Sequence, residues 1–166
     1  KEICDTDWKD LTIERLPEIP NFTLLVGWTG QVAITDSLIQ ATEKKRKVAT
    51  DSAFYKEFLG KSHAIVQGLQ IAWNKQDIPD LQEGIRANRA LLNEFAKVMQ
   101  LEIETPALQT LCNLAEQIGA CAKTSGAGGG DCGICFTQNE QQRQQIENQW
   151  AKAQIQVLPL TIAEAW

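Results

Sequence analysis

Residues 123 to 133 read Lys123-Thr124-Ser125-Gly126-Ala127-Gly128-Gly129-Gly130-Asp131-Cys132-Gly133 and place four glycines within five positions. An apolar run follows, from about Cys132 to Thr137, and predicts a β-strand. Glycine lets the backbone take positive φ angles and approach a ligand closely, so successive N–H groups can converge on phosphate oxygens. The hydroxyls of Thr124 and Ser125 and the ammonium of Lys123 are further candidate donors. The stretch predicts either an anion-binding loop or a flexible surface loop.

The overall composition is that of a globular domain with an acidic balance. Its 166 residues suit one domain and are 43% hydrophobic, which is enough to fill a core. Because 16 Lys and Arg stand against 21 Asp and Glu, the net charge of −5 argues against nucleic acid as a partner but allows one small anion pocket. We find no apolar run of membrane-helix length and no signal peptide. We therefore expect a soluble, cytoplasmic chain with neither a nucleic-acid nor a membrane partner.

Cysteine and histidine offer no metal or hydrolytic site in this sequence. Five cysteines are an odd number in a chain long enough to fold without disulfides, so we expect reduced thiols. Cys132 and Cys135 have the spacing of half a zinc site, but there is no second close pair, and a strand would point the two thiols to opposite faces. His63, the one histidine, lies off the apolar stripe of its helix, so we expect it at the surface. We predict no metal ligands in this chain.

Hydrophobic periodicity predicts the elements around the loop. Strands are expected over residues 11–16, 22–28, 132–137 and 155–160. Helices are expected from the cap residues 35–37 to the basic run 44–47, over 51–74 with Gly60 as a candidate break, from about 80 to 99, from Thr105-Pro106 to Gly119, and over the glutamine-rich residues 140–149. Without strict β–α alternation, this order predicts an α+β fold in which helices cover one face of a four-stranded, mainly antiparallel sheet.

Three further motifs accompany the glycine-rich stretch in a fixed order. They are Leu25-Val26-Gly27-Trp28-Thr29-Gly30-Gln31-Val32-Ala33-Ile34-Thr35, then Asn88-Arg89 with Leu91-Leu92, and then Ile103-Glu104-Thr105-Pro106. Together with the loop and its Asp131, they resemble the phosphomevalonate kinases of the GHMP small-molecule kinase superfamily over roughly residues 8–160. The resemblance implies a ferredoxin-like GHMP kinase C-terminal domain over residues 1–166. Its glycine loop would face an N-terminal domain whose ATP loop no stretch of this sequence resembles.

The same resemblance implies a phosphoryl transfer in the mevalonate pathway of isoprenoid biosynthesis. The γ-phosphoryl group of ATP would pass to 5-phosphomevalonate, giving 5-diphosphomevalonate and ADP, with Mg²⁺ present. ATP and Mg²⁺ would be held largely by the N-terminal kinase domain, the expected partner, so we expect this chain to be inactive by itself. Two alternatives stay open: a non-catalytic domain of GHMP ancestry that binds a phosphorylated metabolite or a partner chain, and another GHMP enzyme such as mevalonate kinase.

The resemblance also implies a set of phosphate- and substrate-binding residues, while the catalytic base stays unassigned. The set is Lys123, Thr124, Ser125, Gly126, Ala127, Gly128, Gly129, Gly130, Asp131, Thr35, Arg89 and Asn88. Thr35 has an alternative role as a helix cap, and Asp131 as a hydrogen-bond partner of its own turn. Arg89 has an alternative role in an ion pair, and Lys123 in solvent. If Asn88 faces inward it needs a polar partner, because an unsatisfied buried amide costs about 1–3 kcal/mol.

Overall fold

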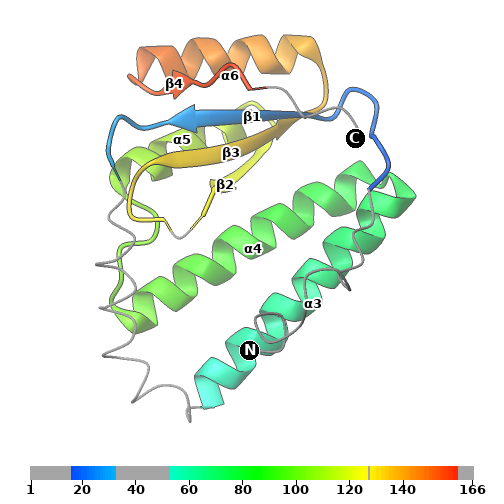
Figure 1. The fold of residues 1–166 in the computed structure, drawn as a ribbon, viewed down its shortest axis with the longest axis vertical. Coiled ribbons are helices and arrows are strands. Elements are labelled where there is room, and N and C mark those ends of the chain that lie inside the picture. Colours follow the sequence, from blue (N-terminus) through cyan, green and yellow to red (C-terminus); the bar gives the residue numbers. More distant parts are fainter. Residues whose placement is uncertain (1–15, 33–52, 127, 161–166) are drawn as a thin grey trace, which may run out of the picture.

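The computed structural model describes residues 16–32, 53–126 and 128–160. They form an antiparallel sheet of four strands in the order β2-β3-β1-β4, with helices packed on it (Figure 1). The strands are β1 (Thr23–Trp28), β2 (Cys121–Thr124), β3 (Cys132–Thr137) and β4 (Gln156–Val157). The helices of the described part are α3 (Ala53–Lys75), α4 (Ile78–Met99), α5 (Pro106–Gln117) and α6 (Glu140–Lys152). The predicted α+β class and the antiparallel sheet are confirmed.

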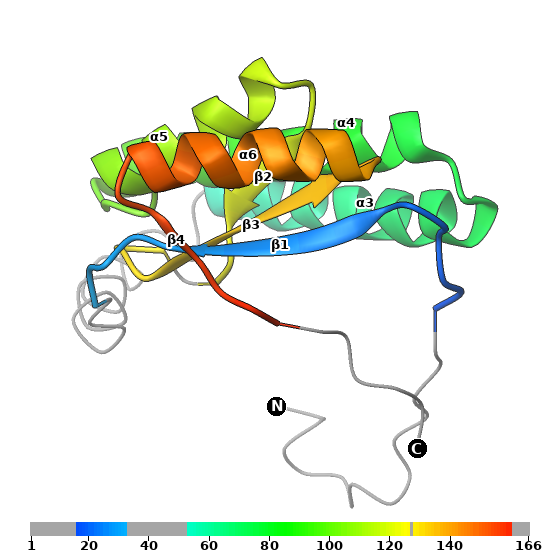
Figure 2. The same ribbon diagram turned by 90° about the horizontal axis from the view of Figure 1, so that it is seen from above.

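The helices form a layer over the sheet and a long hairpin beside it. Figure 2 shows α5 and α6 on one side of the sheet, as the sequence predicts. Helices α3 and α4 run antiparallel to each other, and α4 passes along the edge strand β2 (Figure 1). The hairpin therefore extends the domain well beyond the sheet.

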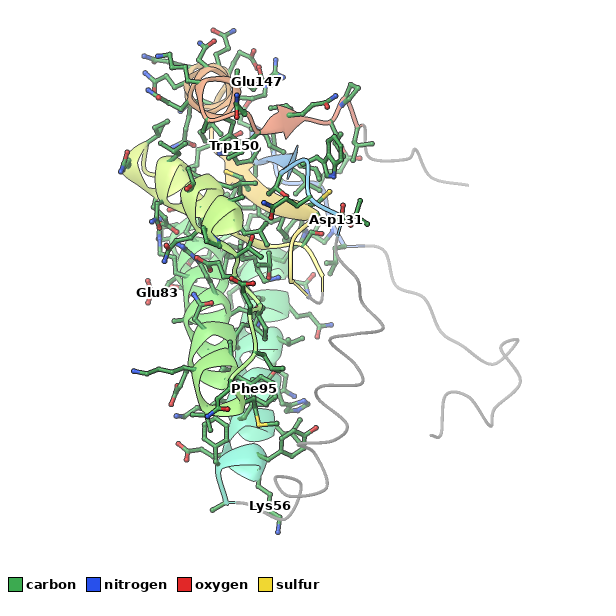
Figure 3. All side chains as sticks on the ribbon, turned by 90° about the vertical axis from the view of Figure 1, so that its left-hand side faces the viewer. Lys56, Glu83, Phe95, Asp131, Glu147 and Trp150 are labelled. Carbon is green, nitrogen blue, oxygen red and sulfur yellow. The ribbon has the colours of Figure 1, made fainter. Side chains whose placement is uncertain are left out.

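Trp150 of α6 is the largest completely buried side chain among the described residues, and it packs between α6 and the sheet (Figure 3). Its indole Nε1 donates to the carbonyl oxygen of Leu111 in α5 at 3.0 Å. Gly27 and Gly133, which face each other across β1 and β3, leave the space for this packing. A Cβ on Gly27 would lie 2.7 Å from Cζ3 of Trp150, and one on Gly133 would lie 2.6 Å from Cδ2 of Leu111. The two glycines are thus required by close packing of helix on sheet.

Two apolar clusters fix the hairpin at its two ends. The cluster beside the sheet contains Phe22, Ala72 and Leu81, with Trp73 and Phe136 packed against them. The cluster at the far end, which we call the tip cluster, contains Phe95, Ala96, Met99 and Ile103, with Phe54, Tyr55, Phe58 and Leu101 packed against them. Because Ile103 follows α4 and precedes α5, the tip cluster also holds the connection between these two helices.

Several predicted boundaries are confirmed, and the caps explain why. Thr105 caps α5, with its Oγ1 accepting the Leu108 N–H at 3.4 Å, and Pro106 occupies the first turn. Asn139 caps α6, with its Oδ1 accepting the Gln142 N–H at 2.8 Å. His63 is exposed, as expected.

Other expectations about the elements are wrong. Gly60 does not divide α3, because one glycine costs only about 1 kcal/mol in a helix, less than packing along α4 supplies. The last strand is much shorter than residues 155–160: Leu158 donates to the Val26 carbonyl at 2.9 Å, and Pro159 then has no N–H to give. Strand β2 was not predicted at all, because its four residues show no alternation. The predicted strand 11–16 lies outside the described residues except at its last position, and the helix at 35–47 lies wholly outside them.

Candidate phosphate-binding site

The glycine loop, residues 125–131, joins β2 to β3 at one end of the sheet. Its neck is closed by the Ser125 N–H, which donates to the Cys132 carbonyl oxygen at 3.0 Å. Ser125 and Gly126 are exposed, whereas Gly128 and Gly130 are buried. Among the described residues of the loop, Ser125 and Gly126 therefore face solvent, whereas Gly128 and Gly130 pack against the protein.

One anchor of the loop is the carbonyl group of Ile103. The Gly129 N–H donates to the Ile103 oxygen at 2.8 Å. Gly128 has a φ of +79°, and a Cβ at this position would overlap the same carbonyl oxygen. A side chain is thus excluded at Gly128 both by the backbone conformation and by contact with the connection between α4 and α5.

The second anchor is Asp131, which binds the turn after β1. Its N–H donates to the Gln31 carbonyl at 2.6 Å, and its carbonyl accepts both the N–H and the hydroxyl of Thr29 at 2.9 Å. Figure 3 shows Asp131 on the opposite side of the sheet from α5. The sequence allowed a structural role for the Asp131 side chain within its own turn. Its Oδ1 accepts from the thiol of the adjacent Cys132 at 3.7 Å, while its main chain binds the neighbouring turn.

These anchors limit which donors the loop can offer to an anion. The amides of Ser125, Gly129 and Asp131 all donate to carbonyl groups of the protein. Within the described part of the loop, the exposed donors that remain are the Gly126 amide and the Ser125 hydroxyl. We call Ser125 and Gly126 the rim of the loop. Ala127, which follows them, lies outside the described residues.

Lys123 and Thr124 belong to β2 and not to the loop. The Lys123 Nζ donates to the Thr124 carbonyl oxygen at 2.6 Å, and burial lowers the pKa of this lysine. Lys123 is half-buried, so the solvated alternative does not describe it. Thr124 is 2% exposed, and its Oγ1 has no hydrogen-bond partner among the described residues. As successive residues of a strand, the two side chains point to opposite faces of the sheet.

Arg89 takes the ion-pair alternative. Its Nε and Nη2 donate to the two carboxylate oxygens of Glu104 at 2.9 and 2.6 Å, and Nη2 also reaches Asn113 Oδ1 at 3.0 Å. Asn93 adds a bond to Glu104 at 2.9 Å. Burial would raise the pKa of Glu104, but these bonds leave its pKa below the usual value. Asn88 is half-buried on the same helix, and Thr35 lies outside the described residues.

Other features of the described residues do not coincide with this loop. A surface groove lies between α6 and the strands β1 and β4, and none of the predicted site residues line it. Among residues 16–32, 53–126 and 128–160, no three His, Cys, Asp or Glu side chains gather as metal ligands. No helix in these ranges is long and apolar enough to cross a membrane.

Comparison with known proteins identifies the family. The profile for the C-terminal region of GHMP kinases matches residues 66–156, more than half of the chain. The chain belongs to the GHMP kinases. The phosphomevalonate kinase of Streptomyces sp. strain CL190 is 37% identical to this GHMP kinase chain over 158 residues, which make up 94% of this chain and 42% of that protein.

Solved structures agree with this assignment. The Lin0012 protein from Listeria innocua superposes with a TM-score of 0.83 and 35% identity, over 89% of this chain and 41% of that one. The phosphomevalonate kinase of Streptococcus pneumoniae, in complex with phosphomevalonate and AMPPNP, superposes with a TM-score of 0.70 and 30% identity, over 81% of this chain and 37% of that one. The GHMP kinase chain thus spans about two fifths of the length of these relatives.

Sequence reasoning missed the residues that hold the loop in this GHMP kinase domain. Ile103 and Glu104 were noticed only as part of a family motif, and Asn93 was not singled out. A signal was present, because Arg89 and Asn93 stand one helical turn apart and interrupt the apolar side of α4. Polar side chains in such a place need buried partners, and an acidic residue just before a capped helix start was the candidate.

Proposed function

We propose that this chain is the C-terminal part of a phosphomevalonate kinase, which transfers the γ-phosphoryl group of ATP to 5-phosphomevalonate and releases 5-diphosphomevalonate and ADP. The observation that carries the proposal is the 37% identity to a phosphomevalonate kinase across 94% of the chain. The pneumococcal relative, whose complex holds phosphomevalonate and AMPPNP, supports it independently.

The rim of the glycine loop suits one part of this reaction. Phosphoryl transfer depends on positioning and on donors around phosphate oxygens more than on covalent chemistry by the protein. The Ser125 hydroxyl and the Gly126 amide are exposed donors on a loop that is anchored at both Ile103 and Asp131. We assign them to a phosphate of the acceptor or of the transferring group, with Lys123 of the preceding strand as a source of positive charge.

In this proposal, ATP and Mg²⁺ bind mainly to the rest of the enzyme. The rim offers donors for a phosphate group of ATP, and the described residues provide no cluster of carboxylates to hold Mg²⁺. We therefore place most contacts to nucleotide and metal on an N-terminal kinase domain that faces the loop. That domain, together with 5-phosphomevalonate, is the proposed partner of this chain in the cytoplasm.

The proposal is tested by measuring ADP release with MgATP and 5-phosphomevalonate, using this chain and the longest protein encoded by its reading frame. We expect turnover by the longer protein and none by the chain alone. Mevalonate serves as the control substrate, and turnover of mevalonate in place of its 5-phosphate would identify a different GHMP enzyme. No turnover by either protein, combined with binding of 5-phosphomevalonate, would favour a non-catalytic binding domain.

A single substitution tests the role of the rim. Ser125→Ala removes one hydroxyl donor from an exposed loop position and should leave folding unchanged. Because a hydrogen bond to a charged group contributes about 1.5–3 kcal/mol, kcat/KM for 5-phosphomevalonate should fall roughly ten- to hundredfold. Ser62→Ala, at a half-buried position of α3, removes a hydroxyl outside the loop and is the control that should retain full activity. Equal kcat/KM values for the two variants would remove Ser125 from the site.

A further inference from the structure

The connection between α4 and α5 has a polar side and an apolar side, and both are firmly held. On the polar side, the Glu104 side chain is only 5% exposed and accepts two hydrogen bonds from Arg89 and one from Asn93. On the apolar side, Ile103 is 6% exposed and belongs to the tip cluster with Phe95. The backbone between these two side chains therefore has little freedom to move.

The glycine loop rests on this connection. The carbonyl oxygen of Ile103 accepts the Gly129 N–H at 2.8 Å, and Gly128 packs so closely on it that no side chain fits. The carbonyl belongs to the peptide bond that leads directly into Glu104. A shift of Glu104 would therefore move the Ile103 carbonyl oxygen, to which Gly129 is bonded. Gly129 is three residues from Gly126 in the rim.

We infer that Arg89 and Glu104 are positioning residues of the glycine loop. Their ion pair fixes the position of the Ile103 carbonyl and thereby the place where the rim meets a phosphate. The two-pronged contact of Arg89 suits this role, because a planar guanidinium fixes a carboxylate in orientation as well as in position. In this role Arg89 acts through Glu104, because its Nε and Nη2 both donate to that carboxylate. The anchoring of the loop follows from the contacts alone, whereas its consequence for a bound phosphate rests on the proposed function.

A second ion pair on the same helices provides a matched control. Arg86 of α4 contacts Glu116 of α5 at 2.8 Å and also donates to the Ala120 carbonyl at 3.2 Å. This pair joins the same two helices as the Arg89 contact to Asn113, but it has no bond to residues 103–104 in the described structure. Breaking it tests for general loosening of α4 and α5 while the hydrogen bonds from Arg89 and Asn93 to Glu104 stay in place.

The test is amide hydrogen exchange of this chain, followed residue by residue by NMR, for wild type, Glu104→Gln, Arg89→Lys and Glu116→Gln. In Glu104→Gln a neutral amide replaces the carboxylate that accepts hydrogen bonds from Arg89 and Asn93. In Arg89→Lys the positive charge stays, but the two-pronged hydrogen bonding of the guanidinium is lost. Both should speed exchange at the Gly129 amide at least about tenfold, while amides of the β1–β3 ladder keep their wild-type rates. Glu116→Gln should leave Gly129 at its wild-type rate.

Two results would overturn the inference. Unchanged exchange at Gly129 in both anchor variants would show that the Ile103 carbonyl keeps its place without the ion pair. Equal acceleration at Gly129 and throughout the β1–β3 ladder would show that the pair stabilises the whole fold and not the loop. Since neither result involves turnover, failure of this inference stays separate from failure of the proposed kinase activity.

Steady-state kinetics of the longest protein encoded by the reading frame then test whether the ion pair positions the rim for a phosphate. A displaced rim should raise the KM for 5-phosphomevalonate at least about tenfold in Glu104→Gln and leave Glu116→Gln unchanged. A merely structural role would instead lower the apparent kcat at unchanged KM, because only the folded fraction turns over. That second pattern would refute positioning of the phosphate by Glu104.

Discussion

Gly128→Ala is the most direct perturbation of the loop anchor. Gly128 has a φ of +79°, and an alanine in left-handed conformation costs about 1–2 kcal/mol. Its Cβ would also overlap the Ile103 carbonyl oxygen, so the loop must move away and lose the 2.8 Å bond from Gly129, which contributes about 1 kcal/mol more. We therefore expect Gly128→Ala to lower the free energy of unfolding by about 2–3 kcal/mol.

Gly126→Ala is the matched control in the same loop. Gly126 is exposed, and a Cβ at this position would meet nothing within 4 Å. Urea unfolding of wild type and both variants, followed by tryptophan fluorescence, gives the two differences, and we expect a change of less than about 0.5 kcal/mol for Gly126→Ala. Equal stability of the two variants would refute the packing of the loop against Ile103, as would a larger loss at Gly126.

Three further expectations concern the core, an ionised side chain and the thiols. Gly27→Ala should destabilise the domain by about 1–3 kcal/mol in thermal unfolding, because its Cβ would lie 2.7 Å from Trp150; an unchanged melting temperature would contradict this packing. Burial raises the pKa of Glu104, but its hydrogen bonds to Arg89 and Asn93 lower the pKa by more, so the net pKa lies below its usual value. A lowered pKa adds stability that is present above the unfolded-state pKa and is lost as pH falls through the folded-state value, so Glu104→Gln should flatten the loss of unfolding free energy between about pH 5 and about pH 3. Iodoacetamide at about pH 8 should label Cys132, which is half-buried, before Cys135, which is completely buried and whose pKa burial raises; peptide mapping that finds the reverse order would count against the register of β3.

The fold could be predicted from sequence wherever a local signal was strong. The Thr105-Pro106 start and the alternation in residues 22–28 each carry such a signal, and the corresponding elements α5 and β1 are present. Strand β2 carries none, because Cys121 and Ala122 are both buried and the strand is defined by pairing with β3. Its existence depends on partner residues nine to fifteen positions away in the chain, which local periodicity does not reveal.

The candidate site was predicted less completely than the fold. The four glycines located the loop, but they did not reveal that Lys123 and Thr124 lie in a strand behind it. Arg89 was chosen as a phosphate ligand because of its charge, and the structure shows that its Nε and Nη2 donate to the carboxylate of Glu104. Charge and motif position identify residues near a site, whereas the partner that neutralises each charge is fixed by tertiary contacts.

The glycines of the loop illustrate why a glycine-rich stretch does not by itself indicate a ligand-binding site. Gly128 is glycine because the protein's own Ile103 carbonyl lies against it, and the amide of Gly129 is used by the same carbonyl. Only Gly126 combines an exposed position with open space around its Cα. Close approach of backbone to backbone and close approach of backbone to phosphate select the same residue type, since both require a missing side chain. In this loop the first requirement accounts for Gly128, and we propose the second only for the rim, so substitutions at Gly128 and at Ser125 should separate stability from phosphate recognition.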